Sequence, residues 1–559
     1  RRAPRRPGRV ATMIDSAPGS KKEPLVKDDA LPLRVEFCQM AGTAVQLSST
    51  RIVRILLTTI DAAFLGHLGT RQLAAVSLAA MWQGVPSTFV QFTIQAITTL
   101  ASQARGAGNA KLMGDWLQTA LAVAVVGALP VMAIFWNVHH MVAVTMDDAQ
   151  TVDYARQFSQ MMMWTLLPQY VYVAVTSYFA TIGVVMPATF STCATVLANI
   201  FFNWYFIYGY GSFAGFGFVG SPLATVVSSW LQLVLFVVYT FAIKRYHSDY
   251  WGGWNREAIS WPRVKTFLEL GVPTGLSSVV DWASGALAGS FSGLCGVQVA
   301  AGQNMLTGLF SLTYSTVSGF STATQIRLAR YLGEGRPEAA KRILRIGSAT
   351  LLAGGVVICV LLTVWHQKVW RIWTNDSTLV KLCNESLPAF MAGLLMAYVR
   401  FTLTVVSVSL GPREAKINLV ANNIASWAIY IPLAYLMPIT WNWGLPGFWW
   451  SDFYGEAFKV ACLTWAVSNV DWARASREAQ AKAAGEDTAA CEQLEQEAYA
   501  SLAAYATPSP KAALANVAEH SPALMTRTAA EQYEGLHLDG GQMKFLRTPN
   551  VRAVHIDDF

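Results

Sequence analysis

One pattern of glycines occurs twice in the chain, and the two copies are 227 residues apart. Gly66-x-x-Gly69 recurs as Gly293-x-x-Gly296, Gly106-x-Gly108 recurs as Gly333-x-Gly335, and Gly217-x-x-Gly220 recurs as Gly444-x-x-Gly447. Only 41 of the 559 residues are glycine, so three paired motifs with one offset indicate an internal duplication. The chain between these motifs is mostly apolar. Two matching apolar halves are typical of membrane folds that bind a ligand between internal repeats.

Twelve apolar stretches are long enough to cross a bilayer, because a helix needs roughly 20 apolar residues to span the hydrocarbon core. They cover residues 40–65, 75–101, 115–137, 158–182, 186–209, 220–243, 267–290, 298–327, 345–365, 386–410, 416–437 and 446–469. An even number of spans per copy returns the second copy to the membrane in the same orientation, so an axis along the membrane normal relates the two halves. We therefore predict an all-α integral membrane protein with twelve transmembrane helices in two six-helix repeats around a central cleft.

The composition excludes a mainly soluble protein. Hydrophobic residues make up 53% and charged residues 13% of the chain, whereas a soluble domain carries about 25% charged residues. The seven cysteines are odd in number and show no C-x-x-C spacing, so we interpret them as packing residues and predict no metal site or disulfide framework. We also expect no cofactor, and we do not interpret the net charge of +7 as a sign of nucleic-acid binding.

Positive charge predicts the orientation. Lysine and arginine gather in one set of the short loops between the spans, and such loops face the cytoplasm. This set includes Arg105, Lys111, Lys244, Arg263, Arg327, Arg336 and Lys341. Both termini are therefore expected in the cytoplasm, and the host membrane is expected to be the plasma membrane or a vacuolar-type membrane.

The apolar spans and the basic loops together predict five segments. They are a disordered cytoplasmic segment 1–33, an N-lobe 34–243, a cytoplasmic linker 244–265, a C-lobe 266–470, and a cytoplasmic tail 471–559 that is first helical and then disordered.

Asp61 is the most informative acid, because it lies near the end of the first predicted span. A carboxylate inside the membrane is costly and usually faces a cavity where it has a function. Desolvation makes the neutral form of a carboxyl group more favourable, which suits proton binding and release. The alternative is an ion pair with Arg54, which lies on the same helix face but about 10 Å away along the axis.

Asp281 is the second candidate, because it lies in the middle of the first span of the second half. The offset of the duplication places it opposite Arg54, so the acids of the two halves are not equivalent. The alternative is a carboxylate satisfied by neighbouring hydroxyl groups, those of Ser277 and Ser278.

Polar residues of the fifth and sixth spans complete the candidate site. Asn199 and Asn203 are four residues apart and therefore share a helix face, and Thr225 follows the Gly217-x-x-Gly220 turn. Such amides and hydroxyls coordinate a cation or hold a carboxylate, or they simply connect neighbouring helices.

Three arginines also lie within predicted spans. Arg51 and Arg54 interrupt the first span, and Arg400 lies in the tenth. They either favour an anionic substrate, or extend toward the membrane surface, or pair with acids.

The chain resembles the multidrug and toxic compound extrusion (MATE) family over roughly residues 34 to 470. The resemblance depends on the order and spacing of several motifs. They are Asp61-Ala-Ala-Phe-Leu-Gly66-His-Leu-Gly69, Gln103-Ala-Arg-Gly106-Ala-Gly108-Asn109, Asn199-Ile-Phe-Phe-Asn203, Gly217-Phe-Gly-Phe-Val-Gly-Ser-Pro-Leu-Ala-Thr225, and Arg327-Leu-Ala-Arg-Tyr-Leu-Gly333-Glu-Gly335.

This resemblance implies a two-lobe antiporter of organic compounds. In bacterial members the acid of the first span and polar residues of spans five and six form a cation site, and Asp61, Asn199, Asn203 and Thr225 occupy those positions here. Asp281 matches the first acid of the seventh span of eukaryotic members. Three other family acids are replaced in this chain, by Ala286, Gly308 and Val399. This departure puts a polyspecific organic-cation pocket in the second lobe in doubt.

We therefore predict a secondary active antiporter that exports xenobiotics or metabolites in exchange for H+ or Na+. Its expected partners are a small organic substrate, the coupling ion and membrane lipid, and it is expected to act as a monomer.

Three other functions share the architecture. One is export of an organic anion, for example citrate, by way of the arginines. The others are a lipid or glycolipid flippase and a channel, although no selectivity-filter repeat is present. An enzyme is the least expected class, because the spans contain no nucleophile–base pair.

Overall fold

The structure is a computed structural model that describes residues 33–484, 536–539 and 542–545 of the chain. The chain forms two compact units, residues 1–483 and 484–559. The first unit contains the helices considered below. In the second unit, two short strands pair antiparallel, β1 (Leu536–Asp539) and β2 (Gln542–Phe545). They lie in the part of the tail that was predicted to lack structure, and residues 485–535 of that tail lie outside the described residues.

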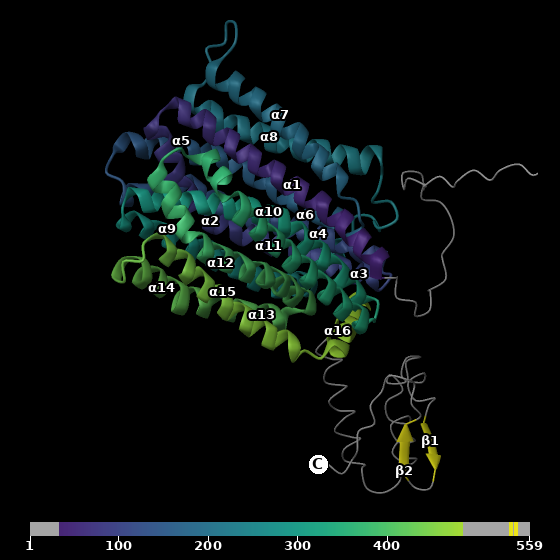
Figure 1. Cartoon of the computed structure of the whole chain (residues 1–559). Helices are drawn as coiled ribbons and strands as arrows, with labels where there is room; N and C mark the ends of the chain where they lie inside the picture. The colour runs from purple at the N-terminus through teal and green to yellow at the C-terminus, as the bar shows by residue number, and fades with distance from the viewer. Residues whose placement is uncertain (1–32, 485–535, 540–541, 546–559) are drawn as a thin grey trace, which may run out of the picture. The chain divides into compact units, whose positions relative to one another are not determined.

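The first half of the first unit contains six helical spans (Figure 1). Their elements are α1 (Leu33–Leu68), α2 (Thr70–Ile94) with α3 (Ala96–Gly106), α4 (Ala110–Thr145), α5 (Ala149–Met162) with α6 (Leu166–Thr181), α7 (Met186–Tyr208), and α8 (Gly220–Val237) with a π-helical end, Val238–Ile243. A 3-10 turn, Met163–Thr165, connects α5 to α6, and another, Gly217–Val219, precedes α8.

The second half repeats this arrangement. Its elements are α9 (Trp261–Ser292), α10 (Val297–Gly333), α11 (Pro337–Trp373), α12 (Ser377–Leu410), α13 (Pro412–Asn423) with α14 (Ile431–Tyr435), and α15 (Leu445–Ser468). Two π-helical turns, Ile424–Tyr430 and Leu436–Thr440, join and extend α13 and α14. A further helix, α16 (Trp472–Ala484), follows the last span.

The predicted fold class is confirmed, because each of the twelve predicted stretches falls on one of these helical spans. Among the described residues, seven spans are long and apolar enough to cross a membrane by length and composition alone. Three of the other five, formed by α1, α9 and α15, carry the charged residues discussed below. In α1, α9 and α15 these charged residues lower the hydropathy of the span.

The backbone confirms the duplication. Gly108 and its counterpart Gly335 have φ angles of 74° and 76°, and Gly217 and its counterpart Gly444 have φ angles of 58° and 59°. Only glycine adopts such left-handed angles without steric cost. The glycine pattern therefore marks turns of one shape at equivalent places in the two halves.

The two halves touch through another pair of repeat-related glycines. A Cβ atom on Gly106 would lie 2.0 Å from the carbonyl oxygen of Arg330, and one on Gly333 would lie 2.1 Å from that of Gln103. Each glycine therefore lets its helix approach the backbone of the other half. Nearby, α1 packs along α10 and α2 packs along α9.

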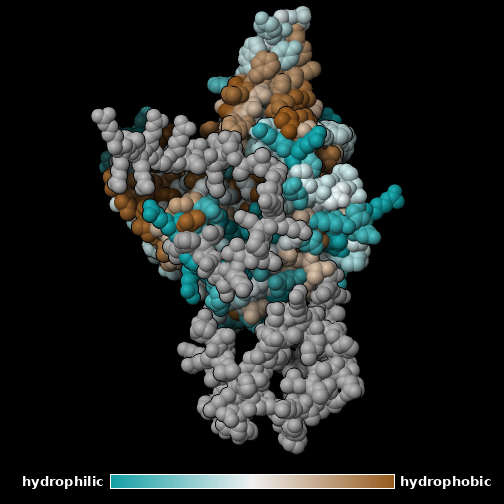
Figure 2. Space-filling model, turned by 90° about the vertical axis from the view of Figure 1, so that its right-hand side faces the viewer, coloured by the Kyte–Doolittle hydropathy of each residue, from teal (hydrophilic) through white to brown (hydrophobic). Residues whose placement is uncertain are grey.

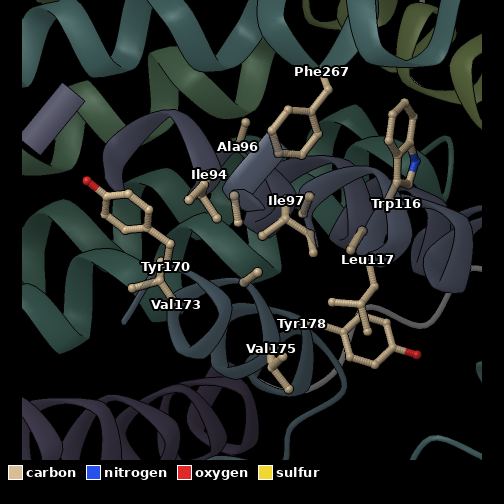
Figure 3. Close-up of a cluster of buried hydrophobic side chains, with 14 of the residues drawn as sticks. Ile94, Ala96, Ile97, Trp116, Leu117, Tyr170, Val173, Val175, Tyr178 and Phe267 are labelled. Atoms are coloured by element: carbon tan, nitrogen blue, oxygen red, sulfur yellow. The ribbon is translucent and has the colours of Figure 1, made fainter. Parts of the chain in front are cut away.

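A buried apolar cluster fixes this end of the first half. Ile94 and Ile97 pack among side chains of α4 and α6, and Phe267 of α9 reaches the same cluster, 6.5 Å from Trp116 between ring centroids (Figure 3). Large apolar side chains are instead exposed on the outer surface, as the brown areas of Figure 2 show. Phe190, Leu197 and Trp465 are each more than two-thirds exposed, at 68%, 70% and 68%. Such a surface is suited to contact with lipid.

Candidate functional site

The first centre of the site is the carboxylate of Asp61, which belongs to α1 and is bonded by side chains of α7 and α8. Asn203 of α7 donates from its Nδ2 to Asp61 Oδ1 at 2.9 Å. Thr225 of α8 donates from its Oγ1 to Asp61 Oδ2 at 3.2 Å. The structure thus brings together the acid of the first span with the predicted polar residues of the fifth and sixth spans.

Asn199 supports this arrangement from the same helix, one turn before Asn203 in the chain. The same Nδ2 of Asn203 lies 3.0 Å from Asn199 Oδ1. Both asparagines are fully buried, and Asn199 Nδ2 and Asn203 Oδ1 make no hydrogen bond within the described part of the chain. The centre therefore holds a buried donor and a buried acceptor that are both available to an ion or a ligand.

The alternative interpretation of Asp61, an ion pair with Arg54, is not what the structure shows. Among residues 33–484 no ion pair includes Asp61, Arg51 or Arg54. Arg51 donates instead from Nη2 to Thr322 Oγ1 of α10 at 3.1 Å. The carboxylate of Asp61 is thus held by neutral donors alone, so no protein cation competes with an incoming ion.

The second centre of the site is a closed ring of four charged side chains in the second half, Asp281, Arg400, Glu456 and Lys459. We call it the C-lobe ring. Arg400 bridges Asp281 Oδ2 at 3.2 Å and Glu456 Oε2 at 2.5 Å, and Lys459 bridges Asp281 Oδ1 at 2.9 Å and Glu456 Oε1 at 3.1 Å. Each cation contacts both carboxylates, so the charges of the ring compensate one another.

The ring corrects the alternative interpretation of Asp281. That alternative had the hydroxyl of Ser277 satisfy the carboxylate, but Ser277 Oγ instead accepts from Asn422 Nδ2 at 2.9 Å. Ser278 donates to the carbonyl oxygen of Thr274 at 3.0 Å. Two cations, rather than neighbouring hydroxyl groups, therefore hold Asp281.

The ring also shows what Arg400 does. Pairing was one of the three roles that the sequence left open for this arginine, and the structure places it between two carboxylates and over the ring of Phe401, 4.3 Å from its centroid. Its side chain is only 10% exposed. Arg400 is therefore already engaged with protein groups.

Sequence reasoning missed Asp452, Glu456 and Lys459. They lie at intervals of four and three residues on one face of the last span, 446–469, and this spacing in an apolar stretch was the signal available. Asp452 lies beside α12, where a Cβ atom on Gly393 would be 3.0 Å from Asp452 Oδ2. The second half therefore has more buried acids than the replaced family positions indicated.

The two halves are held together at the end of the bundle where Leu33 lies, which we call the Leu33 end. Ser48 donates to the carbonyl oxygen of Thr316 at 2.5 Å, and Tyr331 donates to Glu36 Oε1 at 2.5 Å. Gln103 of α3 also donates to the carbonyl oxygen of Ser409 of α12, at 3.1 Å. Along α1, the hydrogen bonds to the second half within residues 33–484 lie between the Leu33 end and Arg51, which itself bonds Thr322, and none is made at the level of Asp61.

Comparisons with known proteins agree with this architecture. The MatE family model matches residues 48–205 and 273–436, one segment in each half. The chain is 25% identical over 435 residues to multidrug and toxin extrusion protein 1 of Homo sapiens, covering 78% of this chain and 75% of that protein. It is 26% identical over 444 residues to the uncharacterized transporter C4B3.13 of Schizosaccharomyces pombe, covering 79% and 80%.

Solved structures share the fold. The crystal structure of the eukaryotic MATE transporter AtDTX14 superposes with a TM-score of 0.71 at 18% identity, covering 80% of this chain and 98% of that chain. The bent form of the Vibrio cholerae MATE transporter VcmN gives a TM-score of 0.68 at 15% identity, covering 80% and 98%.

Proposed function

The chain belongs to the MatE family and is a multi-pass membrane transporter of organic compounds, and from this premise we propose that it is an antiporter that uses Asp61 to couple export to proton entry. The observation that carries the proposal is the carboxylate of Asp61, held between α1, α7 and α8 by Asn203 and Thr225. We use the name N-lobe centre for a group of six residues, Arg51, Arg54, Asp61, Asn199, Asn203 and Thr225. Asp61 is its acid.

The proposed coupling step is the binding of a proton to Asp61. A charged carboxylate in this environment needs its two donors, because its desolvation is otherwise uncompensated. Protonation removes that need, so α7 and α8 are free to adopt a different arrangement around α1. A coupling ion drives transport only if it binds the two conformations with different affinity, and the loss of the contacts to Asn203 and Thr225 supplies such a difference.

We place the Leu33 end of the bundle in the cytoplasm. Arg105, Arg263, Arg327 and Arg336 lie at or near this end, and basic loops favour the cytoplasmic side. The hydrogen bonds between the halves then close the cytoplasmic side. In this orientation the hydrogen bonds between the halves lie on the cytoplasmic side of Asp61, and we infer that Asp61 takes up its proton from the outer side.

We also propose that Asp281 takes part as a second acid. Its side chain is 32% exposed, whereas the other three members of the C-lobe ring are at most 10% exposed. Asp281 is therefore the member of the ring that an ion or a substrate can reach.

Transport by the purified full-length chain in proteoliposomes tests the coupling role of Asp61. An imposed pH gradient is expected to drive the movement of organic compounds in the wild type, and Asp61→Asn is expected to reduce this movement to the level of empty liposomes. Asp153→Asn is the matched control, because Asp153 is an exposed acid of α5 paired with Arg156. Gradient-driven transport that survives intact in Asp61→Asn would disprove the assignment.

The same liposomes distinguish protons from sodium. Sodium prefers oxygen ligands, and the unpaired Oδ1 of Asn203 is the acceptor that such an ion needs beside Asp61. A sodium gradient at constant pH is expected to drive little transport if the proton is the coupling ion. Transport that follows the sodium gradient alone would keep Asp61 as the coupling residue and replace the proton by sodium.

A further inference from the structure

Two arginines of α1 lie inside the membrane without a carboxylate partner. Among residues 33–484, neither Arg51 nor Arg54 belongs to an ion pair. Arg51 donates to the neutral Thr322 Oγ1 of α10 at 3.1 Å. Arg51 and Arg54 are three residues apart, so two positive charges share one helix face.

Such a pair is unfavourable unless an anion joins it. A charge in the membrane interior costs several kcal/mol unless it is paired, and two like charges on neighbouring positions of one face repel each other. The second half shows the usual solution, because Arg400 and Lys459 each contact two carboxylates there. The first half offers no such acid, since Asp61 is bonded to Asn203 and Thr225.

The position of Arg54 is fixed by contacts on either side of it. Thr50 is 2.7 Å from Thr189 Oγ1 of α7, and Asp61 bonds Asn203 of the same helix, so α1 and α7 run side by side and Arg54 lies between these two levels. Arg54 therefore lies on the same face of α1 as Asp61, but nearer to the Leu33 end. This face packs against α7.

The stretch of α7 between Thr189 and Asn203, which runs beside Arg54, and the neighbouring α8 carry several polar groups. Thr192 lies in this stretch, with its Oγ1 3.3 Å from the Tyr172 hydroxyl, and Gln232 of α8 donates to the same Oγ1 at 3.0 Å. Ser228 lies between Thr225 and Gln232 on α8, and its buried hydroxyl makes no hydrogen bond with any described residue. Cations and hydroxyl donors without a carboxylate nearby are suited to an anion.

We propose that Arg51 and Arg54 form an anion-binding site in the N-lobe and that the exported compounds are organic carboxylates. The substrate class rests on the proposed transport function, whereas the anion site itself does not. A guanidinium presents a planar fork of N–H donors that matches the two oxygens of a carboxylate. Arg400, which is equally deep in the other half, is excluded from this role because Asp281 and Glu456 occupy its donors.

Equilibrium binding by isothermal titration calorimetry, with the full-length chain in detergent, tests the site. The probes are citrate, benzoate, chloride and the organic cation tetraethylammonium. We expect citrate or benzoate to bind the wild type, and Arg54→Gln to weaken this binding on the order of thirtyfold or more. Arg54→Lys is expected to retain part of the affinity, because it keeps the charge but loses the fork.

The matched control is Arg34→Gln, in which the same substitution is made in the exposed first turn of the same helix. It is expected to bind the carboxylates as the wild type does. If Arg54→Gln does not fold, as judged by its thermal transition, Arg51→Gln and Arg54→Lys carry the test.

Several results would overturn the proposal. They are binding of tetraethylammonium without either carboxylate, binding of chloride alone, or unchanged carboxylate affinity in both Arg51→Gln and Arg54→Gln. The transport assay separates the two proposals. Carboxylate binding without gradient-driven transport removes the antiporter and leaves the site. Export of cations alone, driven by pH, removes organic carboxylates as the substrate class and leaves the antiporter.

Discussion

The two halves of the molecule place different charges on the same frame. Arg54 of the first half and Asp281 of the second half are 227 residues apart, as are Thr225 and Asp452. At these two pairs of positions both halves carry a polar side chain, but its charge differs, whereas the counterpart of Asp61 is the apolar Ala288.

The consequence is a difference in compensation. The C-lobe ring satisfies its four charges internally, because each cation contacts both carboxylates. The N-lobe centre has one acid held by neutral groups and two arginines outside any ion pair of the described residues. A self-compensated cluster holds helices together, whereas an uncompensated one is ready to bind ions or ligands. We therefore expect the C-lobe ring to contribute mainly to stability, with Asp281 as its accessible acid, and the N-lobe centre to contribute mainly to coupling.

The largest expected effect is the loss of Arg400. Arg400→Gln leaves Asp281 and Glu456 with Lys459 as their remaining partner in the ring, and removing one partner of a buried ion pair costs about 3–5 kcal/mol. The unfolding midpoint in detergent measures this loss. Arg413→Gln, at an exposed position, is the control and is expected to change little.

A double variant sharpens this prediction. Arg400→Met combined with Glu456→Leu removes one cation and one acid together, and it leaves the pair of Asp281 with Lys459, which are 2.9 Å apart. Apolar replacement of a whole buried pair is often neutral, so most of the lost stability is expected to return. A double variant as unstable as Arg400→Gln would show that packing rather than charge compensation explains the loss.

The second prediction concerns the donors of Asp61. Asn203→Ala removes the hydrogen bond to Asp61 Oδ1, which is expected to cost about 1–3 kcal/mol because a hydrogen bond to a charged group is lost. A double-mutant cycle with Asp61→Asn measures the coupling between the two residues. Because Asn at position 61 still offers an oxygen acceptor, additive effects of the two substitutions on the unfolding free energy would mean that the charge of Asp61 does not strengthen this hydrogen bond.

The third prediction concerns the place where the halves are alike. Gly106→Ala and Gly333→Ala each put a Cβ atom against the backbone of the other half, at 2.0 Å and 2.1 Å. Each is expected to cost about 1–3 kcal/mol through overpacking, and the two costs are expected to be similar. Gly42→Ala is the control, because nothing lies within 4 Å of its Cβ position. Very unequal costs would show that the contact between the halves is not symmetric.

The smallest effect, and one of opposite sign, is expected at the counterpart of Asp281. Arg54→Gln removes a cation that has no carboxylate partner, so in a buffer without carboxylates it is expected to raise stability by about 1 kcal/mol. The same unfolding measurement as for Arg400→Gln provides the comparison. A loss as large as that of Arg400→Gln would mean that Arg54 is compensated in the folded protein after all.

The sequence predicted the spans and the N-lobe centre for different reasons. A helix needs about 20 apolar residues to cross the membrane, so each span is visible as a local stretch of composition. Asn199 and Asn203 are one turn apart, and their meeting with Asp61 followed from the family resemblance. The C-lobe ring was less accessible. Its members are distant in sequence, apart from Glu456 and Lys459, and none of the motifs that carry the family resemblance lies in the last span.

By itself, the sequence determined the membrane class, the duplication and the twelve spans, because these follow from local hydropathy and from glycines that must adopt positive φ angles. The sequence also determined which charged residues are present at both centres. Only the tertiary structure decided which charges compensate one another. Pairing depends on distances of a few ångströms between helices, and these place Arg400 between two carboxylates while they leave Arg54 outside the ion pairs of residues 33–484.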